Sequence, residues 1–362
     1  MNNDALAHLI DRLVKIEPNS SPVISCFVGF GADASYEVEK IHAQARLLRR
    51  RLGGMVRHDF EDAYEEIRNS LLAALASPAI KDLRSMALYS RWGDDPCLYV
   101  EGFKVPMKTR LHVGPLPQIY PLVTLKDRYD RFITVLLTED ESRIVETSLG
   151  SITRDILASV PETAARKIGE SLTREIYHRQ GQAEARATDA YLQDKILTLD
   201  KVVEEGGSTH ILLAGNPALT GALQKALPPR LSSLVVSSFC ADWEWGLDSV
   251  LEEAMAQFTC FEARETIDRL AELEASVLSG GLAVVGYDAC TDAIRAGICD
   301  VFLIDQELPW KDTREEMVRL ARDHQVSIET VPSGPRIDRL GGMGCLLRRH
   351  PQPYGVNSAL AA

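Results

Sequence analysis

The sequence predicts an α/β fold divided into several domains. Short apolar runs of the kind that form buried strands recur along the chain, for example at residues 211–214 and 301–304. Segments with helical periodicity and glycine stops separate these runs, which is the order expected of βαβ units. With 362 residues, the chain is also longer than a single hydrophobic core usually supports.

The first predicted domain, residues 1–127, is a mixed α/β domain that ends in a proline-rich stretch. Pro115, Pro117 and Pro121 are expected to interrupt regular structure, so we place a domain boundary after them. In order, we expect an amphipathic helix at the amino terminus, a strand at 23–30, helices at about 35–52 and 59–76 separated by two glycines, and strands at 85–90 and 97–103.

The second predicted domain, residues 128–240, begins with a hairpin and continues as a strand, helix, strand series. A long helical region after Pro161 holds Gly181 and Gln182 near its middle and ends at two glycines, 206 and 207. The expected elements are hairpin strands at 131–138 and 143–147, a buried strand at 209–214, a helix at 218–226 and a strand at 231–237.

The third predicted domain, residues 241–362, opens with a long helix that ends before two glycines, 280 and 281. A βαβ step follows, in which two short apolar strands flank a helix. The expected elements are helices at about 243–278, 288–296 and 312–324, strands at 282–286, 300–305 and 326–331, and a glycine-rich tail at 341–344.

Composition restricts the classes of partner. The formal net charge is −12 at pH 7 and 45% of the residues are hydrophobic, which indicates a globular protein whose overall field repels nucleic acid. Any contact with RNA must therefore be local, and we expect no DNA partner. The amino terminus reads as an amphipathic helix rather than a signal peptide, and no apolar run reaches the length of a membrane span. We expect a cytoplasmic protein without a membrane partner.

Cysteine and histidine spacing predicts neither a metal site nor a cofactor. The seven cysteines are scattered without a CxxC pair, and we expect reduced, mostly buried thiols. The eight histidines show no ligand spacing. Gly29, Gly31 and Ala34 imitate a dinucleotide-binding fingerprint, but no second strand ending in an acid follows about 20 residues later. The acids at 139–141 fit a hairpin turn better than a nuclease metal site.

A Gly-Gln pair in basic surroundings distinguishes the second domain. Residues 177–186 read Tyr-His-Arg-Gln-Gly-Gln-Ala-Glu-Ala-Arg and lead into a strongly helical sequence. Glycine lets a backbone approach a ligand closely, Arg and His can neutralise phosphates, and a glutamine amide both donates and accepts. We therefore expect an RNA-contacting loop, although a polar residue on a solvated helix is an equally good interpretation of Gln182. The candidate residues are His178, Arg179, Gln180, Gly181, Gln182 and Arg186.

Three segments resemble one protein family. Residues 297–305 read Gly-Ile-Cys-Asp-Val-Phe-Leu-Ile-Asp, residues 340–348 read Leu-Gly-Gly-Met-Gly-Cys-Leu-Leu-Arg, and residues 211–217 read Ile-Leu-Leu-Ala-Gly-Asn-Pro. Together with the order of the units, these segments resemble the archaeal and eukaryotic class-I peptide-release factor and Pelota superfamily in its bacterial form. The resemblance covers about residues 23–349 and is best in the last third.

The resemblance implies a transfer-RNA-like protein of three domains that binds the ribosome. It implies a mixed α/β N-terminal domain facing the decoding centre, an RNase H-like middle domain facing the peptidyl-transferase centre, and a ribosomal-protein L7Ae-like C-terminal domain. The last contacts the ribosome or an elongation-factor-type GTPase. Family release factors carry Gly-Gly-Gln on a middle-domain loop, and Gln180, Gly181 and Gln182 occupy that place here. Gln182 is thus the candidate catalytic residue, and Gln180, whose Cβ restricts the backbone, replaces the first glycine.

Two basic runs in the first domain are further candidates for RNA contact. Arg49, Arg50 and Arg51, near Arg46 and Arg57, can meet ribosomal RNA phosphates. The alternative, which we favour, is a solvated helix face whose arginines pair with glutamates 37 and 39. The same alternatives apply to the second run, which consists of Lys104, Lys108, Arg110 and His112. No Asn-Ile-Lys-Ser motif for reading a stop codon is present.

Two functions from different classes follow as expectations. The first is a ribosome-binding factor that occupies the vacant A site in hibernation or in the response to stalled ribosomes, without reading a stop codon. The second is an enzyme, a codon-independent peptidyl-transfer RNA hydrolase that acts through Gln182. A protein that has kept the fold and lost the ribosome is a weaker third hypothesis.

Overall fold

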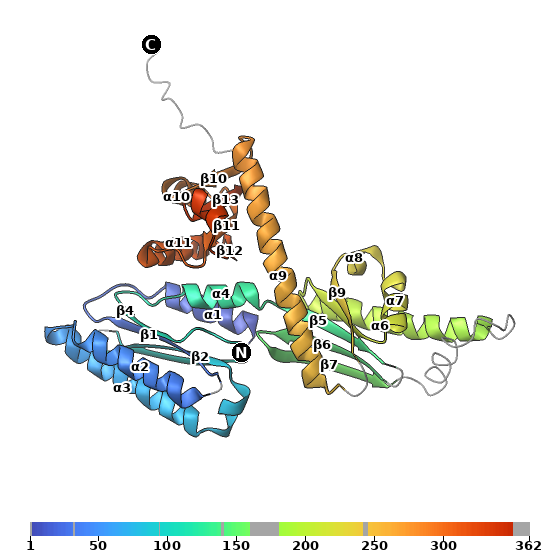
Figure 1. Ribbon diagram of the computed structural model, residues 1–362, viewed down its shortest axis with the longest axis horizontal. Helices are drawn as coiled ribbons and strands as arrows, with labels where there is room; N and C mark the ends of the chain where they lie inside the picture. Colours follow the sequence, from blue (N-terminus) through green and yellow to red (C-terminus); the bar gives the residue numbers. More distant parts are fainter. Residues whose placement is uncertain are drawn as a thin grey trace, which may run out of the picture. The chain divides into compact units, whose positions relative to one another are not determined.

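The structure is a computed structural model that describes residues 2–31, 33–93, 95–138, 141–159, 181–241 and 245–349. The chain divides into two compact units. Unit 1 combines Asn3–Arg128 with the chain from Arg264 onward, and unit 2 spans Tyr129–Ala263. Three sheets alternate with helices along the sequence, which confirms the predicted α/β fold class (Figure 1).

The amino-terminal part of unit 1 is a four-stranded antiparallel sheet with helices on both faces. Its strand order is β3-β2-β1-β4. Helices α2 and α3 cover one face and bury residues such as Val28, Ile41 and Ile67, whereas α1 and α4 lie on the other (Figure 1). The elements are α1 (Asn3–Val14), β1 (Val23–Gly29), α2 (Ala34–Arg49), α3 (Gly54–Ala76), the short 3-10 helix η1 (Pro78–Asp82), β2 (Ser85–Arg91), β3 (Cys97–Phe103), β4 (Arg110–Gly114) and α4 (Tyr120–Arg128).

Three features of this part differ from the sequence prediction. The sequence did not predict β4, whose polar residues form a strand because they pair with β1. The proline-rich stretch starts α4 instead of interrupting regular structure, since Pro121 lies in the first helical turn, where its missing amide costs no helical hydrogen bond. Helix α3 begins at Gly54, about one turn earlier than expected.

Unit 2 is built on a five-stranded mixed sheet with strand order β7-β6-β5-β8-β9. Strands β5, β8 and β9 are parallel, while β6 and β7 form an antiparallel meander with β5. This is the arrangement expected of an RNase H-like domain. The elements are β5 (Phe132–Leu137), β6 (Glu141–Ser148), β7 (Ser151–Ser159), α6 (Gly181–Gly206), β8 (Ile211–Gly215), α7 (Pro217–Ala226), α8 (Pro229–Ser232), β9 (Val235–Cys240) and the first half of α9 (Leu247–Leu278).

Helices cover both faces of the sheet in unit 2. On one face, Leu199 of α6 and Leu223 of α7 pack with strand residues such as Leu213. On the other face, Phe258 of α9 stacks on Phe132 with 4.6 Å between ring centroids. Strand β9 starts four residues later than predicted, because two prolines at 228 and 229 begin the short helix α8.

The carboxy-terminal part of unit 1 is a second mixed sheet with strand order β10-β13-β11-β12. The predicted βαβ step forms, but the last strand, β13, lies between its two strands and is antiparallel to both. The elements are β10 (Ala283–Val285), α10 (Tyr287–Arg295), β11 (Cys299–Asp305), α11 (Lys311–Asp323), β12 (Ser327–Val331), α12 (Pro335–Arg339) and β13 (Met343–Leu347).

Each sheet lies within one of the three predicted domains, 1–127, 128–240 and 241–362. The limits of these domains stay a prediction, because the first and last sheets belong to one compact unit. All seven cysteines are free, and four of them are buried: Cys26, Cys290, Cys299 and Cys345.

Candidate functional site

Helix α6 carries the Gly-Gln pair at its amino-terminal end. Gly181 and Gln182 are its first two residues. Further along, Leu192, Ile196 and Leu199 recur at helical spacing and pack into the core of unit 2. At 1.5 Å per residue, Gly181 lies about 16 Å along the helix from Leu192. Figure 1 shows the first turns of α6 extending beyond the strands of the sheet.

The structure places half of the predicted motif on this helix. Gly181, Gln182 and Arg186 all lie in α6. The structure does not describe the side-chain contacts of these three residues. His178, Arg179 and Gln180 lie outside the described residues. The motif therefore leads directly into a helix whose second half is fixed in a hydrophobic core.

The three predicted arginines of the first domain lie at the turn between α2 and α3, where they differ in their contacts. Arg49 Nε donates to Glu61 Oε1 at 2.5 Å, and Arg57 Nε donates to the same oxygen at 3.1 Å. These bonds lower the pKa of Glu61. Arg50 and Arg51 are exposed, and within the described residues their side chains have no hydrogen bond or ion pair. Of the three arginines, these two are available to an external anion without displacing a glutamate.

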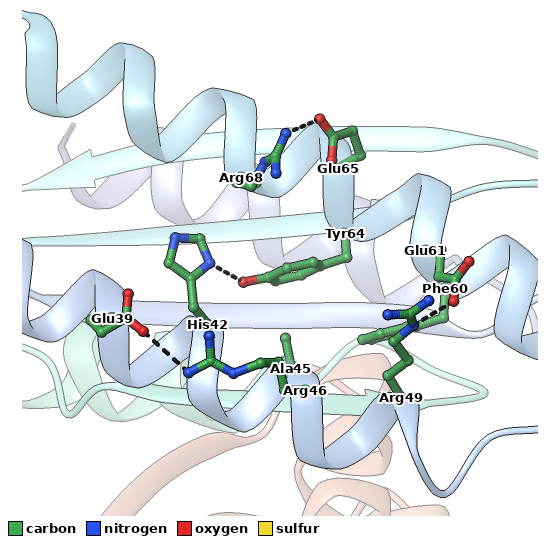
Figure 2. Close-up of a pocket in the computed structure, with 10 residues that line it drawn as sticks. All are labelled: Glu39, His42, Ala45, Arg46, Arg49, Phe60, Glu61, Tyr64, Glu65 and Arg68. Carbon is green, nitrogen blue, oxygen red and sulfur yellow. Dashed lines mark hydrogen bonds and ion pairs between the residues drawn. The ribbon is translucent and has the colours of Figure 1, made fainter.

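A groove of about 490 Å³ lies beside this turn, between α2 and α3 (Figure 2). His42 Nδ1 and the hydroxyl of Tyr64 are 2.6 Å apart in it, and Tyr64 stacks on Phe60 with 5.8 Å between ring centroids. Burial raises the pKa of Tyr64, which therefore remains a neutral hydrogen-bonding group. The lining residues are Glu39, His42, Ala45, Arg46, Arg49, Phe60, Glu61, Tyr64, Glu65 and Arg68.

Charges along this groove are paired within the protein. Arg46 contacts Glu39 at 3.1 Å, and Arg68 contacts Glu65. Because each arginine has a carboxylate partner, the groove offers an aromatic floor and hydrogen-bonding groups rather than an excess of positive charge. Sequence reasoning missed His42 and Tyr64. The spacing of residues 39, 42, 46 and 49, which share one face of α2, is the signal that could have revealed them.

The members of the second basic run differ in their surroundings. The guanidinium of Arg110 lies 5.1 Å from the ring centroid of Phe27, and burial lowers its pKa. Lys108, which is exposed, approaches Glu307 at 3.4 Å. One member of the run thus packs against the sheet and another, which is exposed, pairs with an acid. Contact of this run with RNA stays a prediction.

Within the described residues, no three His, Cys, Asp or Glu side chains are grouped so that they could hold a metal ion. None of the helices that the structure describes is long and apolar enough to cross a membrane.

Solved structures similar to this chain include several translation factors. An archaeal translation termination factor, aRF1, has 15% identity over 96% of this chain and 99% of its own, with a TM-score of 0.29. Dom34 of S. cerevisiae, described as a translation termination-like factor interacting with Hbs1, has 12% identity over 75% and 87%, with a TM-score of 0.43. Archaeal Pelota from a ribosome-bound model with ABCE1 has 14% identity over 97% and 95%, with a TM-score of 0.44.

The middle of the chain also matches a protein family. No curated protein matches it. Residues 117–259 match the family model of bacterial archaeo-eukaryotic release factor family 10. This segment contains α4, the whole sheet of unit 2 and helix α6 with the Gly-Gln pair. Over this segment the chain is similar to the bacterial archaeo-eukaryotic release factors of that family.

Proposed function

We propose that this protein is a ribosome-binding translation factor that occupies the A site without reading a stop codon, in hibernation or in the response to stalled ribosomes. One observation carries the proposal. The release-factor match at residues 117–259 encloses α6, and α6 begins with Gly181 and Gln182. The superfamily resemblance adds an elongation-factor-type GTPase as the partner that delivers the protein.

The chemistry of the motif favours binding over catalysis. A glutamine amide beside a glycine can contact the transfer RNA ester or neighbouring RNA through both its donor and its acceptor. Gln180, however, replaces the glycine that begins the family motif, and a side chain at this position adds bulk and restricts the backbone. The tip of the motif is thus less suited to a crowded catalytic cavity than Gly-Gly-Gln.

A second function is supported by the retained glutamine. In this alternative, the Gln182 amide orders a water molecule against the peptidyl-transfer RNA ester, and the protein releases peptides from stalled ribosomes. Such an arrangement stabilises the transition state by fixed hydrogen bonds.

The turn between α2 and α3 supports the RNA-binding part of the proposal. Arg50 and Arg51 are exposed beside Met55, which is 79% exposed. Two guanidinium groups without a carboxylate partner are suited to bidentate contact with phosphates. Because the whole chain carries a net charge of −12, this contact is local, and its affinity must depend on salt.

Peptide release separates the two functions. Ribosomes that hold labelled peptidyl-transfer RNA beside an empty A site are incubated with the protein or with the Gln182→Ala variant, and released peptide and cosedimented protein are measured. We expect wild-type protein to cosediment without releasing peptide above background. Release that disappears in Gln182→Ala, with cosedimentation retained, would instead establish the hydrolase.

A further inference from the structure

Helix α11 joins the two parts of unit 1 through two buried charged side chains. Glu315 and Arg319 lie one helical turn apart, with side chains 13% and 11% exposed and 3.7 Å between Oε1 and Nε. Burial opposes both charges, since it raises the pKa of Glu315 and lowers that of Arg319. A buried ion pair under this penalty is weak evidence for stability by itself. The other contacts of the two side chains indicate what they do.

Glu315 supplies the amino-terminal cap of α4. The carbonyl of Ile119 accepts the first helical hydrogen bonds from Leu122 and Val123, so Ile119 holds the capping position without a side-chain acceptor. Glu315 Oε1 accepts from Ile119 N at 2.5 Å, and Oε2 accepts from Tyr120 N at 3.2 Å. A carboxylate nearly 200 residues away thus satisfies amides that a local Ser or Asp usually satisfies.

Arg319 performs the corresponding role at the carboxy-terminal end of α1. Its Nη1 donates to the carbonyls of Leu13 and Val14 at 3.4 and 3.2 Å, and its Nη2 donates to the carbonyl of Pro117. Leu13 and Val14 are the last residues of α1, where carbonyls lack the usual helical donors, and apart from Arg319 the Leu13 carbonyl accepts from the amide of Ile16 at 3.3 Å. The positive charge also opposes the negative end of the helix dipole.

Further contacts surround this pair. Arg322 donates to Asp11 Oδ1 at 2.6 Å. Asp127 Oδ2 accepts from the amide of Thr330 at 2.9 Å and from its hydroxyl at 2.7 Å. Thr330 belongs to β12, an edge strand of its sheet. Asp127 of α4 therefore accepts a hydrogen bond from a backbone amide that no neighbouring strand pairs.

We infer that Glu315 and Arg319 form a latch between the two parts of unit 1. One turn of α11 caps both α1 and α4, so loss of either side chain loosens both helix ends together. The apolar clusters on the α2/α3 face of the first sheet and around α12 in the second are separate, whereas α1, α4 and α11 contact one another and bury Leu13, Leu122 and Val318. Loss of the latch therefore loosens the ends of α1 and α4 that face α11, while the apolar clusters of both sheets remain packed. Replacing both members of an ordinary buried ion pair by apolar side chains can leave stability unchanged. Replacing Glu315 and Arg319 in this way would destabilise the protein, because the backbone amides and carbonyls that they cap would lose their hydrogen bonds.

Amide hydrogen exchange of the full-length protein, read by mass spectrometry, tests the latch. The variants are Glu315→Leu, Arg319→Met and the double variant. In each we expect exchange to rise on the order of a hundredfold at both residues 11–16 and residues 117–123, because uncapping buried helix ends opens them locally. Amides of β1, β2 and β11 should keep their protection. Exchange in the double variant should remain as fast as in the single variants, because the double variant restores neither cap.

Two controls and a milder variant complete the experiment. Glu316→Leu changes the neighbouring exposed carboxylate, and Arg348→Met removes an exposed arginine that pairs with Asp300. Both should exchange like the wild type at residues 11–16 and 117–123. Glu315→Gln keeps an acceptor oxygen and should give a smaller increase even if the leucine variant does not fold. Wild-type protection in Arg319→Met, or its recovery in the double variant, would overturn the latch.

Discussion

Arg49, Arg50 and Arg51 are adjacent and chemically identical, yet the structure gives them different surroundings. Arg49 shares Glu61 with Arg57 across the turn between α2 and α3, whereas Arg50 and Arg51 have no side-chain hydrogen bond or ion pair in the described part of the chain. A guanidinium that is already paired with a carboxylate must lose that partner before it binds a phosphate. We therefore propose that any RNA contact at this turn is made by the second and third arginines.

The salt dependence of ribosome binding tests this assignment. For Arg50→Ala combined with Arg51→Ala, the slope of log binding constant against log salt concentration should become shallower by about 0.7–0.9 for each phosphate that the variant no longer neutralises. Arg49→Ala is the matched control and should leave the slope close to that of the wild type. Cosedimentation over a series of salt concentrations measures both. Equal changes of slope for all three arginines would contradict the assignment.

Residue-level predictions from sequence succeed where partners lie on one helix. The favoured interpretation pairs Glu37 and Glu39 with arginines; Glu39 contacts Arg46 on the same helix, whereas Glu37 pairs with Lys40 instead. The pairing of Arg49 with Glu61 crosses a turn between two helices, so no periodicity reveals it. Gly181 and Gln182 are recognisable because glycine and glutamine beside basic residues carry a chemical meaning that does not depend on tertiary contacts.

At the scale of elements, apolar strands are easy to predict and polar ones are not. The runs that form β1, β8 and β11 are almost continuously apolar, which is the pattern of strands buried on both faces. Strands β4 and β7 contain charged and polar residues and exist because a neighbouring strand pairs with them. Such strands depend on tertiary context, which a single sequence does not contain.

Gly215 at the end of β8 provides a prediction at this scale. Its φ of +119° is a conformation that side chains rarely adopt, and a Cβ there would collide with the carbonyl of Leu137 on the neighbouring strand. Gly215→Ala should therefore destabilise unit 2 by about 2–4 kcal/mol. Gly221→Ala is the control, because nothing lies within 4 Å of a Cβ inside α7. It should stabilise by about 0.5–1 kcal/mol.

Equilibrium urea unfolding followed by circular dichroism measures both changes. The transition of unit 2 should move to lower urea concentration in Gly215→Ala and slightly higher in Gly221→Ala. An unchanged midpoint in Gly215→Ala would show that β8 accommodates the side chain by shifting against β5.

At the scale of the whole molecule, the sequence predicts three successive domains, but the structure contains a discontinuous unit. The hydrogen bonds from Arg319 to the end of α1 join residues about 306 positions apart. Contacts at this separation leave no periodic or compositional signal, so a reading along the chain cannot detect them. The two candidate sites accordingly belong to different units: the arginine-bearing turn lies in unit 1, whereas α6 with its Gly-Gln pair lies in unit 2.

Occupancy of the A site without codon reading is the central claim of this account, and a competition experiment tests it most directly. Ribosomes with peptidyl-transfer RNA in the P site are prepared with either a sense or a stop codon in the A site, and binding of the protein is measured with the A site empty or filled by transfer RNA. We expect equal binding at both codons and no binding once the A site is filled. Binding that persists beside a filled A site, or that requires the stop codon, would contradict the account.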